Sequence, residues 1–145
     1  MEKFILEGYG NFLKITLAEV FDFPEKTSSL RGYDTKSTLE ISSGDFQCNF
    51  IIYISMDDIL KFYKELYEAN KSLSGSISFT NIYDRNLEFS INYDVNGQVL
   101  ITGIISSTTD FGNSLNFEFM SDQSYIQSTL IELDIIAKKY GDKRN

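Results

Sequence analysis

The sequence predicts an α+β fold: a single domain, residues 1–145, made mainly of antiparallel β-sheet with about eight strands and two α-helices. In several stretches apolar residues recur at every second position, as in strands with one buried face. In two longer stretches, one mid-chain and one C-terminal, they recur at intervals of three and four, which is typical of amphipathic helices. Short polar connections favour antiparallel pairing over crossover units.

The first half of the chain predicts two hairpins. Residues 4–6 and 12–20 flank a turn containing Gly8 and Gly10. Residues 37–42 and 46–54 flank a Ser-Gly-Asp turn, and the second of these strands carries an apolar face of Phe46, Cys48, Phe50, Ile52 and Ile54. Between the hairpins, residues 22–36 hold the only proline and several charged residues, so we expect an exposed loop there.

The mid-chain helix is predicted to begin at about Met56. Ser55 stands three residues before Asp58, as in a capping box, and acids in a first turn favour the positive end of the helix dipole. Ser74-Gly75 ends the pattern. The predicted buried stripe consists of Ile59, Phe62, Tyr63, Leu66, Tyr67 and Leu73.

The second half predicts four further strands and the C-terminal helix. Residues 77–79, 87–93 and 99–105 alternate, and Asn96-Gly97 indicates a tight hairpin between the last two strands. A polar loop precedes the strand 115–119, and Ser121 or Asp122 caps the final helix. Its predicted apolar stripe is Ile126, Leu130, Leu133, Ala137 and Tyr140, with Gly141 as C-cap.

The composition excludes most catalytic chemistry. The chain has no histidine, which removes Ser-His-Asp and Cys-His pairs and histidine-ligated metals. The single cysteine, Cys48, alternates with apolar residues and is interpreted as buried and unreactive. Asp57 and Asp58 are adjacent acids, but a capped helix explains them. We therefore expect no catalytic residue, no metal site and no cofactor.

One enzyme class and one binding class stay open. A glycosidase-like enzyme needs only two well-placed carboxylates, and the chain has 21 acidic residues. A small-ligand binder belongs to the same open class of alternatives. Either should present one deep, enclosed pocket with convergent polar groups.

The net charge predicts the kind of partner. Thirteen basic and 21 acidic residues give a formal net charge of −8. A chain with this charge repels phosphate backbones and anionic membranes and attracts basic surfaces. We therefore expect no direct nucleic-acid or membrane binding. The N-terminus lacks the pattern of a signal peptide, and no apolar run approaches the ~20 residues of a membrane span, so a cytoplasmic location is expected.

Four segments carry a resemblance to a known family: residues 12–17, 55–62, 86–91 and, above all, the strand-into-helix segment 115–126. Together they resemble the WapI-type immunity proteins of bacteria, which protect a cell from the toxin at the end of its own contact-dependent surface protein. The resemblance implies a non-catalytic chain, monomeric or weakly dimeric, that neutralises a cognate toxin in a tight stoichiometric complex. A nuclease toxin would present a basic cleft that an acidic inhibitor complements. The family pattern supplies no motif from which functional residues can be carried over.

The candidate partner-binding residues are Asp22, Glu25, Tyr33 and Asp34, because recognition residues often lie on loops held by a rigid sheet. The alternative interpretation is ordinary solvated loop charges. Tyrosines near other predicted loops, Tyr9, Tyr83 and Tyr93, are either interface residues or caps on core edges. A small acidic chaperone or adaptor for a secreted protein is the alternative function, and a self-complementary dimer with an exposed sheet edge would favour it.

Overall fold

The computed structural model describes residues 1–25, 32–107 and 112–141 of the chain. These residues form eight strands and two helices, which confirms the predicted α+β fold. In chain order the elements are β1 (Lys3–Gly8), β2 (Asn11–Val20), β3 (Asp34–Ser43), β4 (Phe46–Ser55), α1 (Met56–Ser72), β5 (Ser76–Thr80), β6 (Leu87–Tyr93), β7 (Gln98–Ser106), β8 (Ser114–Asp122) and α2 (Gln123–Tyr140).

Each half of the chain forms a four-stranded meander followed by one helix. The first sheet has the order β1-β2-β3-β4 and the second β5-β6-β7-β8, and all neighbouring strands are antiparallel. The predicted Asn-Gly hairpin joins β6 to β7, with Gly97 in the left-handed region at φ 78°. The halves share this order of elements although no residue-level repeat relates their sequences.

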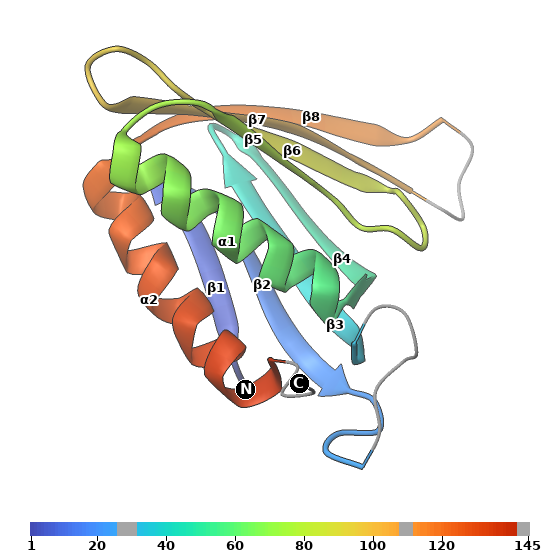
Figure 1. Ribbon diagram of the computed structural model, residues 1–145. Coiled ribbons are helices and arrows are strands. Elements are labelled where there is room, and N and C mark those ends of the chain that lie inside the picture. Colours follow the sequence, from blue (N-terminus) through green and yellow to red (C-terminus); the bar gives the residue numbers. More distant parts are fainter. Residues whose placement is uncertain (26–31, 108–111, 142–145) are drawn as a thin grey trace.

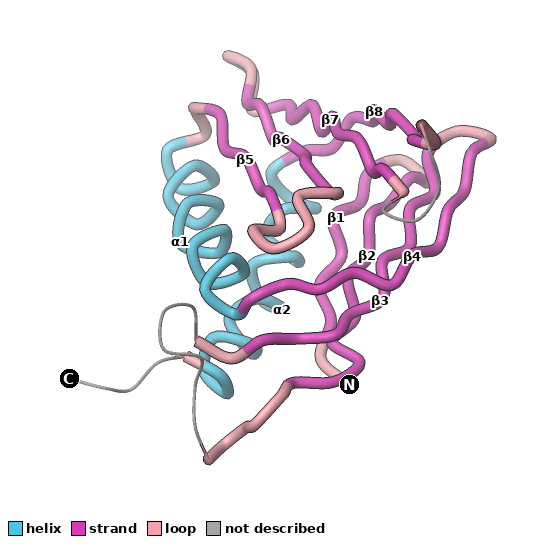
Figure 2. Tube along the Cα trace, turned by 90° about the vertical axis from the view of Figure 1, so that its right-hand side faces the viewer, coloured by secondary structure: helices cyan, strands magenta, loops and turns pink. Residues whose placement is uncertain are grey.

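The two sheets and two helices enclose one apolar core. α1 and α2 run side by side in front of the first sheet, and the second sheet lies across the top (Figure 1). Turned by 90°, the two helices lie on the left, β5 lies beside α1, and most of the other strands lie to the right (Figure 2). The ring of Phe62 in α1 lies 5.9 Å from Phe4 in the first sheet and 5.4 Å from Phe89 in the second. One helical side chain therefore joins both sheets.

Both helices begin at predicted caps. The Ser55 hydroxyl accepts a hydrogen bond from the Asp58 amide at 3.2 Å, and the Asp122 carboxylate accepts from the first-turn amides of α2. α1 ends at Leu73, which adopts the left-handed conformation that glycine usually supplies. Gly141 donates its amide to the Ala137 carbonyl but has an extended backbone.

Two local predictions differ from what the structure shows. The loop expected over 22–36 is shorter, because β3 already begins at Asp34 and pairs with the end of β4. The apolar face of β4 has the predicted alternation, yet only Ile52 and Ile54 are buried, whereas Phe46 is 66% exposed. The hairpin end of β4 therefore extends beyond the core.

Candidate partner-binding site

The four predicted residues lie on one segment between β2 and β3 but differ in accessibility. Asp22 and Glu25 are exposed just after β2, and Asp22 has a left-handed backbone with φ 63°. Asp34 is half-buried at the start of β3. Tyr33 is only 9% exposed, so it presents little surface to a partner. Residues 26–31, which belong to the same predicted loop, lie outside the described residues.

Tyr33 instead ties this segment to the C-terminal helix. The ring of Phe23 packs edge-on against Tyr33 at 5.2 Å and against Tyr140 at 4.8 Å. The Tyr33 hydroxyl donates to the Pro24 carbonyl at 3.4 Å. Edge-to-face aromatic pairs of this kind stabilise beyond their buried area. The tyrosine predicted as a contact residue therefore positions its acidic neighbours.

Asp34 borders an open depression of about 370 Å³. We call it the acidic tyrosine depression; it is lined by Phe21, Asp34, Thr35, Tyr53, Tyr83 and Asp84. Tyr53 and Tyr83 are 44% and 49% exposed, so each ring is half covered by protein and half available to a partner. The Tyr83 hydroxyl donates to Asp34 Oδ1 at 2.8 Å, which fixes the ring beside the carboxylate.

The base of the depression is rigid because its polar groups are paired. The Phe21 amide donates to the Asp34 carbonyl at 2.9 Å, which joins the end of β2 to the start of β3. Below it, the buried Thr35 hydroxyl donates to the Ile54 carbonyl at 2.9 Å and lies 2.8 Å from the Ser37 hydroxyl. Buried hydroxyls that are satisfied in this way hold strands in register.

The other wall of the acidic tyrosine depression is the loop 81–86 between β5 and β6, and Asn81 holds this loop in place. Its side chain is fully buried; Nδ2 donates to Asn86 Oδ1 at 2.7 Å and to the Tyr53 carbonyl at 3.3 Å, and Oδ1 accepts from the Leu87 amide at 3.0 Å. One amide therefore closes the loop on itself and attaches it to β4, as the neighbouring positions of loop and strand in Figure 2 show.

The first turn of α1 secures the same loop. Asp58 Oδ2 accepts a hydrogen bond from the Ile82 amide at 3.1 Å, while the Asp58 amide is capped by Ser55. The predicted helix-capping acid therefore also holds the segment that presents Tyr83 and Asp84. Two independent contacts fix this loop, so the depression is preformed.

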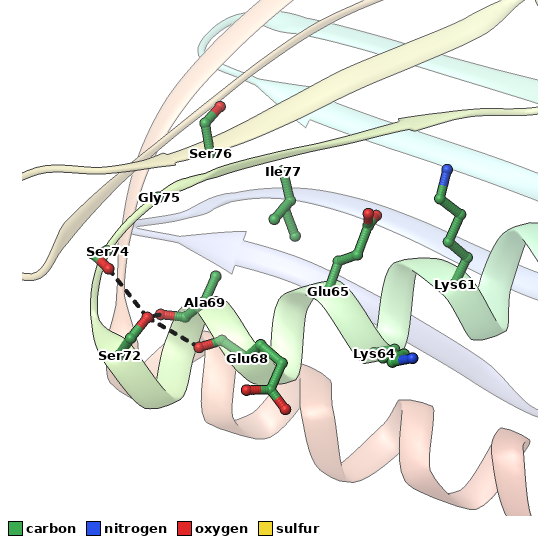
Figure 3. Close-up of a pocket in the computed structure, with 10 residues that line it drawn as sticks. All are labelled: Lys61, Lys64, Glu65, Glu68, Ala69, Ser72, Ser74, Gly75, Ser76 and Ile77. Atoms are coloured by element: carbon green, nitrogen blue, oxygen red, sulfur yellow. Dashed lines mark hydrogen bonds between the residues drawn. The ribbon is translucent and has the colours of Figure 1, made fainter.

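A second depression, between α1 and β5, has a volume of about 630 Å³ and is open to solvent. Figure 3 shows its wall of helix side chains, in which Lys61 and Lys64 lie toward one end and Glu65 and Glu68 toward the other. Mixed charges on the solvent face of a helix provide no convergent polar groups. This depression lacks the enclosure that a carboxylate-only enzyme or a small-ligand site needs.

The described residues contain no group of three or more His, Cys, Asp or Glu side chains that could hold a metal ion. Cys48 is half-buried, and its burial raises the pKa of the thiol, which keeps it protonated and weakly nucleophilic. In the same part of the chain, no helix is long and apolar enough to cross a membrane.

The profile of the immunity protein WapI-like family matches residues 4–141. The chain belongs to this family. Membership in the WapI-like immunity family supports an immunity role and implies a toxin partner. A search of curated proteins finds no match to the chain.

Sequence reasoning located part of the WapI-like protein's candidate site. Asp34 is a predicted contact residue, and Tyr83 is one of the tyrosines expected to be either interface residues or caps on core edges. Tyr53, Asp84 and Asn81 were missed, since nothing local shows that the loop 81–86 packs on β4. The available signal was Tyr53, a large aromatic side chain on the face of β4 opposite its predicted apolar face.

Proposed function

We propose that this chain is a non-catalytic immunity protein that neutralises a cognate secreted toxin domain in the cytoplasm by forming a tight one-to-one complex. The acidic tyrosine depression is the contact surface. The observation that carries the proposal is the pair of half-exposed tyrosines beside two carboxylates, Asp34 and Asp84, on a preformed base. Family membership supports the immunity role, and the depression supplies a surface for it.

The chemistry of the depression favours a basic protein partner. Tyrosines that are partly covered before binding lose little conformational entropy and are enriched among the residues that dominate binding energy. Asp34 and Asp84, with the exposed Asp22 and Glu25 on the neighbouring segment, offer acceptors to Lys and Arg side chains. The net charge of −8 would steer a basic toxin, such as a nuclease with a phosphate-binding cleft, toward this surface.

The test compares two double variants with the same net charge. Asp34→Lys with Asp84→Lys reverses the charge of the depression, whereas Glu68→Lys with Glu88→Lys reverses two exposed acids that do not line it. The proposal predicts that the first pair raises the Kd for the toxin domain by about tenfold or more and abolishes protection, since several contacts change sign. The second pair should lower only the association rate. Equal affinities of the two double variants would contradict this placement of the site.

The second candidate function is a small acidic chaperone or adaptor for a secreted protein. The open edge of β4 favours it, because such proteins bind extended segments at sheet edges. That function predicts binding to an unfolded secreted segment and no rescue of cells from a toxin. Survival assays separate it from immunity.

A further inference from the structure

The free edge of β1 is sealed by other elements. Its Ile5 amide donates to Glu132 Oε1 of α2 at 2.9 Å, and its Ile5 carbonyl accepts from the Thr129 hydroxyl at 2.5 Å. The Glu7 carbonyl accepts from the Ser121 hydroxyl of β8 at 2.6 Å. Side chains thus form hydrogen bonds with backbone groups that would otherwise pair with another strand.

The edges of the second sheet are protected in other ways. The Glu118 carbonyl of β8 accepts from the Ser43 hydroxyl at 3.1 Å, and the Met120 carbonyl lies directly over Gly8, where a Cβ would clash. β5 is only five residues long, and α1 runs along it. Short or covered edge strands resist pairing with another chain.

β4 has neither kind of protection along most of its length. It is a terminal strand of the first sheet, ten residues long, without a charged residue or proline, and it pairs with β3 in unbroken register. Phe46 and Ile51 are 66% and 57% exposed. Natural edge strands usually carry Lys, Pro or a bulge to prevent association. Among the described strands, β4 alone combines length, apolar surface and an uncovered edge.

Backbone geometry identifies the groups that are available for pairing. The Tyr53 carbonyl accepts from Asn81, which lies outside the sheet, so the polar backbone groups of Tyr53 point away from β3. Because these directions alternate in an antiparallel pair, the amides and carbonyls of Gln47, Asn49 and Ile51 also point outward. Those of Cys48 and Phe50 point toward β3.

We propose that the open edge of β4, residues 47–51, receives an extended segment of the toxin as an additional strand. This inference rests on the proposed immunity function and adds the mode of recognition. Acids flank the edge: Asp45 stands in the turn at one end, and Asp34 and Asp84 border the depression at the other. The matching segment carries apolar side chains beside Ile51 on one face of the sheet and beside Phe46 on the other, with Lys or Arg toward its ends.

Charge favours the toxin over a second copy of this chain as the occupant. Each chain carries −8, so pairing two β4 edges would bring two strongly acidic molecules together. A basic segment gains attraction at the same edge. Main-chain hydrogen bonds would then provide affinity along β4, and the adjacent depression would select the side chains of the partner.

The decisive experiment is amide hydrogen exchange of the whole chain, alone and bound to an inactivated form of its cognate toxin domain. In the free chain the amides of Gln47, Asn49 and Ile51 should exchange rapidly, and those of Cys48 and Phe50 slowly. Binding should slow the three outward amides by at least about tenfold.

Each other outcome has a distinct meaning. A one-to-one complex whose outward amides still exchange rapidly overturns strand addition and leaves the immunity function intact. Protection that grows with concentration in the toxin-free sample overturns the proposal in favour of a second copy. If no complex forms, the proposed function fails, and strand addition fails with it.

A pair of variants at one position tests the same mechanism by affinity. Asn49→Pro removes an outward amide without touching the bonds to β3, and edge strands tolerate such a proline. Asn49→Ala removes the same side chain but keeps the amide. We expect a Kd increase of about tenfold for the proline variant and less than about threefold for the alanine variant. If the proline and alanine variants both fold and bind the toxin with equal affinity, strand addition is overturned. If the proline variant does not fold, the exchange experiment decides the question.

Discussion

Replacing Asn81 with alanine should lower the free energy of unfolding by about 3 kcal/mol. The side chain is fully buried and serves two buried partners, the Leu87 amide at 3.0 Å and Asn86 Oδ1 at 2.7 Å. A buried polar group left without its partner costs about 1–3 kcal/mol, and two such groups at about 1.5 kcal/mol each give the predicted value. The Tyr53 carbonyl lies nearer to solvent and can regain a water, so it adds little.

Urea unfolding measures this loss, and a matched variant controls for the substitution itself. Asn116→Ala removes the same side chain from an exposed position on β8 and should change the free energy of unfolding by less than about 0.5 kcal/mol. Because Asn81 positions the loop that presents Tyr83 and Asp84, Asn81→Ala should also weaken toxin binding. A loss below about 1 kcal/mol would refute the reasoning, since Asp58 alone would then be sufficient to hold the loop.

Three further variants test the core and the pH dependence. Phe62→Ala should cost about 3–5 kcal/mol in urea unfolding, because this ring joins the two sheets. Gly103→Ala should cost about 1–3 kcal/mol by thermal or urea unfolding, because its Cβ would lie 2.6 Å from the Glu88 carbonyl and 2.7 Å from Phe89 Cβ. Glu2→Gln should destabilise at neutral pH and progressively less as the pH falls below 4.5, because the hydrogen bonds from Tyr140 and Lys139 lower the pKa of Glu2 from that ordinary value.

The sign of the last prediction follows from linkage. A carboxyl whose pKa is lower in the folded state binds fewer protons there, so its stabilisation is complete above the unfolded pKa and is lost as the pH falls through the folded one. Parallel pH profiles of stability for the wild type and Glu2→Gln would contradict the role of Glu2.

The core predictions have their own refuting outcomes. An effect of Phe62→Ala as small as that of exposed Tyr67→Ala would contradict the central packing. An unchanged free energy of unfolding in Gly103→Ala would contradict the close approach of β6 and β7.

Local patterns predicted the elements because local physics decides them. Alternation along β6 and β7 with Asn-Gly between them was sufficient to identify that hairpin, and Ser55 and Asp122 cap the helices as their positions in the sequence indicate. The start of β3 was misplaced because Asp34 to Lys36 follow a proline- and glycine-containing stretch, while their pairing with β4 depends on partners far along the chain.

The candidate site was only partly predictable because its walls come from distant segments. Asp34 and Tyr83 are 49 residues apart and meet through one hydrogen bond. Tyr33 and Asp34 are adjacent, yet the first enters an aromatic cluster with Phe23 and the second faces the depression. The exposed position of Phe46 at the hairpin end of β4 likewise depends on tertiary packing, which alternation within β4 does not encode.

The most direct measurement is co-expression of this chain with a candidate cognate toxin domain, scoring cell survival and co-purification. The immunity function predicts that cells survive and that the two chains co-purify in a one-to-one complex, which the Asp34→Lys, Asp84→Lys variant no longer forms. Persistent toxicity without a complex would contradict the account and favour the chaperone or adaptor function.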